Sequence, residues 1–177
     1  TVRLQAIHFY PMESAETQDR AFRAGRLHNT YEMIPAKIEQ YETGSPEILR
    51  KDPYLGSYFY RYNTTEPPFD DVRVRRALAM AIDRESIVKN VSRGGQIPAN
   101  YFTPPSTAGY TTRARIPSDV EAAKALLAEA GYPNGEGFPK ASIIFNTSEN
   151  HRSIAAAIQE MWRKHLNIEV ELNNQEW

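Results

Sequence analysis

The sequence predicts one α/β domain over residues 1–177, and three observations support this prediction. Strand-like and helix-like patterns alternate along the chain, which favours the α/β class. Residues 141–173 have the pattern of a strand, a helix and a second strand, and such a connection normally joins parallel strands. The length of 177 residues is sufficient for one hydrophobic core.

The first third of the chain is expected to mix short strands with short helices. Apolar residues favour a strand over 2–10, and a second short strand is expected over 28–32. The stretch 14–27 is typical of a short helix that ends near Gly25, because glycine readily adopts the left-handed conformation of a helix C-cap. Proline favours the first turn of a helix, so a helical turn is expected over 35–41.

Residues 54–63 are rich in aromatic side chains and predict a strong strand. Their alternation places Tyr58, Tyr60 and Tyr62 on one side of the strand. Tyrosines in such a row pack under helices or line a binding surface, since each offers a large apolar area and one hydroxyl. Packing in the core is the favoured interpretation here.

Two consecutive helices are predicted after this strand. Apolar residues recur at helical spacing over 74–82, and Asp70 or Asp71 can cap the first helix. The second helix is expected to begin at Asp83 and to end in the sequence RGGQ. A proline-rich irregular loop over 97–117 follows, and long ordered loops in compact domains are often functional.

The last third of the chain is expected to contain two helices and two strands. Ser118 and Glu121 have the spacing of a capping box at the start of a helix. The composition of 141–146 predicts a strand that is buried on both faces. A helix capped by Thr147 or Ser148 follows, and residues 168–173 then alternate as a half-buried strand does.

Composition and motifs argue against several function classes. A net charge of −1 leaves no basic excess for binding a nucleic acid. The absence of cysteine excludes disulfides, zinc–thiolate sites and thiol nucleophiles. No P-loop, G-x-G-x-x-G, H-E-x-x-H or EF-hand motif is present, and the four histidines do not form a metal-ligand pattern. We therefore expect no cofactor and no metal.

The turn after the 141–146 strand is the candidate site. Asn146 ends this strand and His151 lies in the first turn of the next helix, where loops of α/β proteins direct side chains toward ligands. A hydrolase built on Ser148 and His151 is an alternative. However, Ser148 is not in a G-x-S-x-G motif, and serine at a helix N-cap is usually structural. An enzyme is therefore not expected.

The sequence YFYRYNTTEPPFDDVRVRRALAMAIDRESIVKNV is the most specific segment of the chain. It resembles the oligopeptide-binding receptors of bacterial ABC importers, which form extracellular solute-binding family 5. The shared pattern is an aromatic strand followed by N-x-x-x-x-P-F-x-D-x-R-V-R-x-A-L-x-x-A-I-D-R. The segments GGQIPANYFTPP, FNTSENH and NNQEW follow in the order of this family, and the ending NQEW points to its oligopeptide branch.

The resemblance implies a periplasmic-binding-protein-like lobe of type II, with a mixed sheet flanked by helices. Members of this family are two-lobed receptors that close around a peptide, so the chain is expected to be most of the C-terminal lobe. The resemblance also implies a periplasmic or other extracytoplasmic location. The expected partners are an oligopeptide ligand and an ABC permease in the membrane.

The resemblance assigns four ligand-binding residues. His151, within N-T-S-x-x-H, is similar to a histidine that faces the peptide, and Asn146 belongs to the same corner. Trp177 is similar to the wall of a side-chain pocket, which implies that it is not a natural terminus. Glu13 resembles a pocket carboxylate. The motif over 71–84 is interpreted as architectural.

Two further functions remain open at this point. The same scaffold could bind another solute, such as haem, a nickel chelate or a sugar. The chain could also be an interaction module that contacts a permease or another protein.

Overall fold

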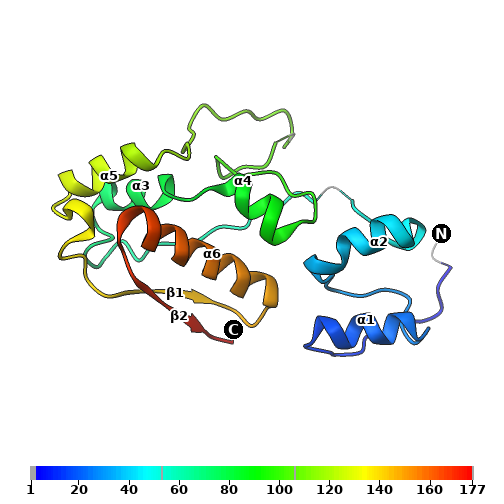
Figure 1. Ribbon diagram of the computed structural model, residues 1–177. Helices are drawn as coiled ribbons and strands as arrows, with labels where there is room; N and C mark the ends of the chain where they lie inside the picture. Colours follow the sequence, from blue (N-terminus) through cyan, green and yellow to red (C-terminus); the bar gives the residue numbers. More distant parts are fainter. Residues whose placement is uncertain (1–2, 53, 106, 177) are drawn as a thin grey trace. The chain divides into compact units, whose positions relative to one another are not determined.

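The computed structural model describes residues 3–52, 54–105 and 107–176. The chain divides into two compact units, Thr1–Arg50 and Lys51–Trp177 (Figure 1). Each unit has helices and buried residues of its own. The single lobe expected over residues 1–177 remains a prediction.

The first unit is helical. Its elements are α1 (Ala15–Arg23), η1 (Pro35–Lys37), α2 (Ile38–Gly44) and η2 (Pro46–Ile48). The helix predicted over 14–27 and the helical turn that begins at Pro35 are confirmed. Gly25 has a φ of 70°, and its N–H donates to the carbonyl of Phe22 at 2.9 Å. This left-handed glycine ends α1 as expected.

The two strands predicted in the first unit are wrong for the described residues. Residues 3–10 and 28–32 contain no strand. The apolar side chains of the first segment are largely exposed, with Phe9 at 87%. A strand requires a hydrogen-bonded neighbour, and the alternation of residue types alone cannot supply one.

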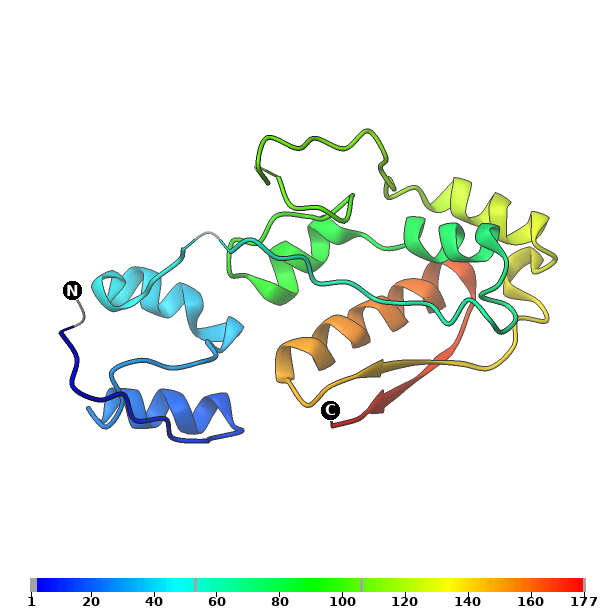
Figure 2. The same cartoon turned by 180° about the vertical axis from the view of Figure 1, so that it is seen from behind.

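The second unit contains the sheet and the larger helices. Its elements are α3 (Val72–Met80), α4 (Arg84–Ser86), π-helix η3 (Ile87–Ser92), α5 (Val120–Glu129), η4 (Pro133–Gly135), β1 (Ala141–Phe145), α6 (Glu149–Leu166) and β2 (Val170–Asn174). Strands β1 and β2 are parallel, with Ala141 opposite Val170. Helix α6 lies along this pair (Figures 1 and 2), so the predicted strand–helix–strand unit is confirmed.

Short side chains at the helix starts explain where the helices begin. Asp71 accepts a hydrogen bond from the backbone N–H of Arg73 at 2.7 Å and caps α3. Asp83 caps α4 in the same way. Ser148 caps α6 by accepting from the backbone N–H of His151. These three caps agree with the sequence prediction.

The capping box predicted at Ser118 and Glu121 is wrong. Asp119 is the N-cap of α5, and its carboxylate accepts from the backbone N–H of Ala122 at 3.0 Å. The hydroxyl of Ser118 instead donates to the carbonyl of Ile82 at 2.7 Å. A carboxylate accepts helix N–H groups strongly, which explains why α5 begins one residue later than expected.

The core of the second unit lies between its helices and one face of the sheet. Its largest fully buried side chains are Leu78, Leu127, Leu166, Ile168 and Val74. In β1, Ile143 and Phe145 are buried, whereas Ile144 is 53% exposed. The prediction of burial on both faces is therefore wrong, because α6 covers one face and the other stays open among the described residues.

The strong strand predicted over 54–63 is also wrong. This segment forms no ladder with another strand within the described ranges and can be followed in Figure 2. Its tyrosines divide between two roles. Tyr60 and Tyr62 pack against the core of the second unit, while Tyr58 is 48% exposed.

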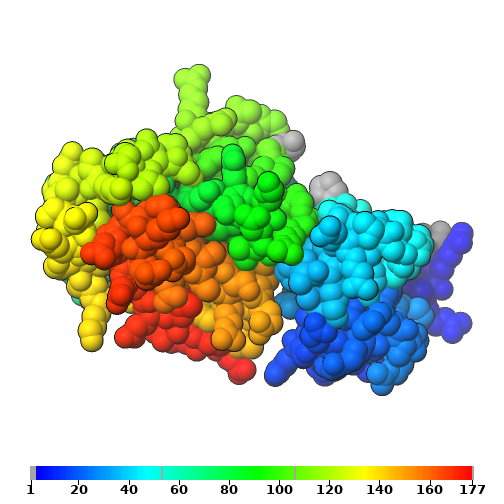
Figure 3. Space-filling model, viewed as in Figure 1, coloured from blue at the N-terminus to red at the C-terminus, as the bar shows by residue number. Residues whose placement is uncertain are grey.

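The outer face of α6 is polar and exposed. Arg152, Glu160 and Lys164 lie at the surface of this helix, which is orange in Figure 3. In the part of the chain that the structure describes, no helix combines the length and the apolar composition needed to cross a bilayer.

Candidate functional site

The candidate site is the corner where β1 turns into α6. Asn146 directly follows β1, and His151 lies in the first turn of α6. Nδ1 of His151 and Oδ1 of Asn146 are 2.5 Å apart. The strand end and the helix start thus place the two predicted residues in direct contact.

An aromatic side chain from a distant part of the sequence completes this corner. The ring of Tyr58 stacks on the imidazole of His151, with ring centroids 4.6 Å apart and an interplanar angle of 19°. Tyr60 meets Tyr58 edge-on at 5.5 Å, and the hydroxyl of Tyr58 donates to that of Tyr60 at 3.4 Å. We call Tyr58, Asn146 and His151 the histidine corner.

The hydroxyls of Tyr58 and of its neighbour Tyr60 stay protonated at neutral pH. Burial raises the pKa of Tyr58. Burial also raises the pKa of Tyr60. The two phenols therefore serve as neutral hydrogen-bonding groups and contribute no charge.

The end of β2 lies beside the end of β1. Thr147 Oγ1 donates to Asn174 Oδ1 at 2.9 Å, and the backbone N–H of Gln175 donates to the carbonyl of Phe145 at 2.9 Å. The carboxyl ends of both parallel strands therefore meet next to the histidine corner. Ligands of open α/β sheets commonly bind at this edge.

The four predicted ligand-binding residues have different outcomes. Asn146 and His151 lie together, as described above. Glu13 is an exposed residue of the first unit, and Trp177 lies outside the described residues. The role of all four in binding stays a prediction. Sequence reasoning did not assign Tyr58 to this corner, although the aromatic row at 58–62 was a signal for it.

The corner lacks the contacts of a serine hydrolase. Ser148 caps α6, and His151 Nδ1 contacts Asn146 rather than the serine hydroxyl. A nucleophile–base pair needs these two side chains within hydrogen-bond reach of each other. Among the described residues, no cluster of three or more His, Cys, Asp or Glu side chains could hold a metal ion.

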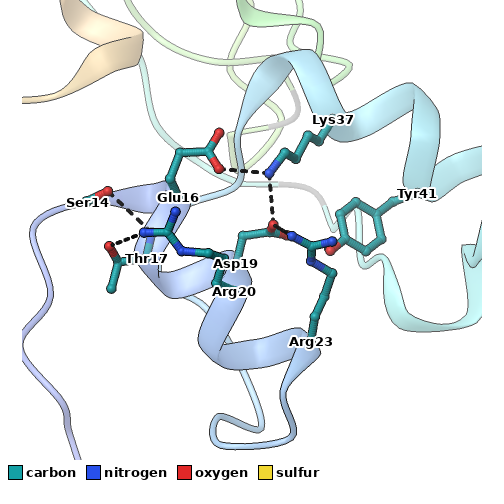
Figure 4. A network of polar contacts seen from close by, with 8 residues as sticks. All are labelled: Ser14, Glu16, Thr17, Asp19, Arg20, Arg23, Lys37 and Tyr41. Carbon is teal, nitrogen blue, oxygen red and sulfur yellow. Dashed lines mark hydrogen bonds and ion pairs between the residues drawn. The ribbon is translucent and has the colours of Figure 1, made fainter.

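A second polar cluster lies in the first unit (Figure 4). Asp19, on α1, accepts hydrogen bonds from Lys37 at 2.9 Å and from the Tyr41 hydroxyl at 2.5 Å. Arg23 pairs with the same carboxylate at 3.1 Å, and Lys37 also binds Glu16 at 2.9 Å. We call these five residues the aspartate cluster.

The pKa of Asp19 reflects two opposing effects. Burial of the carboxylate favours its neutral form. Hydrogen bonds from Tyr41 and Lys37, aided by the charges of Lys37 and Arg23, outweigh burial and lower the pKa. A hollow of about 310 Å³ adjoins the cluster, but its charged groups already pair with one another. We therefore interpret the cluster as a set of structural contacts that hold α1 against α2.

Comparison with known proteins adds independent information on the family. The model described as "Bacterial extracellular solute-binding proteins, family 5 Middle" matches residues 1–177. The chain belongs to the bacterial extracellular solute-binding proteins, family 5. The family resemblance noted from the sequence is thereby confirmed.

Several named bacterial proteins are similar to this chain over most of its length. The periplasmic oligopeptide-binding protein OppA of Salmonella typhimurium is 35% identical over 98% of the chain. The structure of the murein tripeptide-binding protein MppA of Escherichia coli matches 93% of the chain with a TM-score of 0.82 and 39% identity. This match confirms the α/β class and the type II periplasmic-binding fold.

Two further similar proteins differ in the ligand that their names state. OppA of Haemophilus influenzae, solved in complex with RPPGFSPFR, covers 92% of the chain at 33% identity and a TM-score of 0.73. The probable deoxycholate-binding periplasmic protein YgiS of Escherichia coli is 34% identical over 98% of the chain. The chain spans about a third of the length of these relatives.

Proposed function

We propose that this chain is part of the substrate-binding component of an ABC peptide importer. The complete receptor captures oligopeptides between two lobes in the periplasm and delivers them to the permease. The observation that carries this proposal is the histidine corner at the carboxyl ends of the two parallel strands. The peptide-binding names of similar proteins give it further support.

The chemistry of the corner suits a peptide. It offers one imidazole, neutral phenols and an amide, and these groups hydrogen-bond to main-chain groups without selecting one side-chain charge. Receptors that bind extended peptides obtain affinity from the main chain, and bridging waters accommodate varied side chains. We propose His151, Asn146, Glu13 and Trp177 as ligand-binding residues and assign no covalent chemistry to them.

Calorimetric titration of oligopeptides tests this proposal. For this chain alone we expect a Kd of about 1 mM or weaker, since enclosure by a second lobe is absent. In the complete receptor, His151→Ala should weaken binding, whereas Arg152→Ala, an exposed neighbour on α6, should leave it unchanged. Micromolar binding by this chain alone, or an unchanged Kd for His151→Ala, would contradict the proposal.

A different solute is the second candidate function, because the 34% identical relative YgiS carries a deoxycholate-binding name. Mass spectrometry of ligand that co-purifies with the complete receptor distinguishes the two. A mixture of peptides supports the first function. A steroid, haem, a nickel chelate or a sugar as the single retained compound supports the second.

A further inference from the structure

We propose that Tyr58 and Asn146 are positioning residues that hold the His151 ring so that its Nε2 atom faces the ligand. The importance of this atom for ligand binding depends on the proposed function. The arrangement of the ring does not, because it follows from contacts within the second unit.

The first contact fixes the edge of the ring. Oδ1 of the Asn146 amide is an acceptor, so the His151 nitrogen 2.5 Å away carries the proton. In the neutral imidazole, Nδ1–H therefore donates to Asn146 and Nε2 keeps its lone pair. The hydrogen bond at one ring nitrogen thus sets the state of the other.

The second contact fixes the face of the ring. Tyr58 covers one side of the imidazole at a centroid distance of 4.6 Å. Tyr60 supports Tyr58 through an edge-on contact and a hydroxyl hydrogen bond, and Tyr60 itself packs against the core. A continuous path of contacts therefore connects the core to the His151 ring.

These contacts leave one edge of the imidazole free. Within the described part of the chain, Nε2 of His151 makes no hydrogen bond, and the residue is half-buried. The capping bond from the His151 backbone N–H to Ser148 also fixes the start of the side chain. Nδ1 and one ring face are occupied, so Nε2 is the nitrogen that a bound molecule can reach.

Nuclear magnetic resonance of this chain tests the ring state without any peptide. Nitrogen-15 shifts of the His151 ring should be recorded in mildly alkaline solution, where the two neutral tautomers are compared. We expect the Nδ1–H tautomer to dominate, and Asn146→Leu to shift the balance toward Nε2–H. Dominance of Nε2–H in the unmodified chain would overturn the assignment.

Variants of Tyr58 test the stacking contact in the same spectra. Tyr58→Phe keeps the ring and should preserve the ring-current shift of the His151 protons, whereas Tyr58→Leu should abolish it. Tyr54→Leu is the matched control, because Tyr54 lies in the same segment and is 90% exposed. A ring-current shift that survives Tyr58→Leu would contradict the role of Tyr58.

Peptide affinity of the complete receptor provides the functional measurement. An aromatic pair contributes about 0.5–1.5 kcal/mol, which corresponds to a factor of about 2 to 12 in Kd. Tyr58→Leu should weaken binding by about this factor, and Tyr58→Phe by less. If the ring state is as expected but the Kd is unchanged, positioning for the ligand is refuted while the tautomer assignment stands. If no peptide binds at all, only the proposed function fails.

Discussion

The two units of the chain are stabilised by different interactions. The second unit has a continuous apolar core that includes Leu78, Trp162 and Ile168. In the first unit, Ala21 and Ile38 are the buried apolar side chains among the described residues, and the polar side chains of Gln18 and Asp19 are buried with them.

In the first unit, hydrogen bonds of buried polar side chains supplement the small apolar core. The amide of Gln18 donates to the carbonyl of Met12 at 3.0 Å and accepts from the backbone N–H groups of Tyr31 and Glu32. Asp19 binds Lys37, Arg23 and Tyr41, as described above. A short segment has little apolar surface to bury, so directional bonds fix the position of its helices.

The largest effect should follow from opening the apolar core. Trp162 is 7% exposed, and its Nε1–H donates to the carbonyl of Leu78 at 2.9 Å. Trp162→Ala should lower the free energy of unfolding of the second unit by about 3–5 kcal/mol. Hydrogen exchange of α3 and α6 measures the loss. Equal protection in variant and parent would show that Trp162 is not part of a tight core.

A smaller effect is expected from the aspartate cluster. Asp19→Asn removes the charge that Lys37 and Arg23 share, so the first unit should lose about 1–2 kcal/mol, since these partners are partly exposed to solvent. Exchange of α1 and α2 amides should accelerate, while that of α3 and α6 stays unchanged. Lys164→Gln, at an exposed position of α6, is the control.

The same cluster makes the first unit sensitive to acid. The pKa of Asp19 is lowered in the folded chain, so its contribution is complete above the unfolded value of about 3.9. The contribution is lost as the pH falls below that value and through the folded pKa. In Asp19→Asn this part of the pH dependence should disappear. An identical acid profile in parent and variant would exclude Asp19 as its source.

The smallest effect should come from a surface ion pair on the second unit. Arg163 and Glu160 are 2.7 Å apart and both are largely exposed. Water and salt screen such pairs, so Glu160→Gln should not change the thermal unfolding midpoint measurably. A clear decrease would mean that charges also support the second unit, and the contrast between the units would weaken.

The sequence predicted the helices well because their signals are local. Asp71, Asp83 and Ser148 cap helices through backbone groups two or three residues away. The strands predicted over 2–10, 28–32 and 54–63 failed because a ladder requires a partner that no local pattern specifies. The existence and parallel pairing of β1 and β2 were predicted correctly, since a single helix connects them.

The same distinction applies to the candidate site. Asn146 and His151 are five residues apart on one turn, so their proximity followed from the order of elements. Tyr58 lies near the start of the second unit's sequence, far from His151, so no local pattern predicted their contact. The alternating tyrosines at 58–62 were compatible with packing in the core and with lining a surface. The structure shows both arrangements: Tyr60 packs against the core, and Tyr58 stacks on the imidazole of His151.

The parallel pair formed by β1 and β2 has a consequence for the order in which the chain folds. Its register and the covering helix α6 come from one uninterrupted stretch of sequence. The strand pairing joins residues 29 positions apart, whereas the bond from Trp162 to Leu78 spans 84 positions, and a shorter loop costs less entropy to close. We therefore expect this stretch to be an early-folding nucleus, against which α3, with its bond from Trp162, docks later.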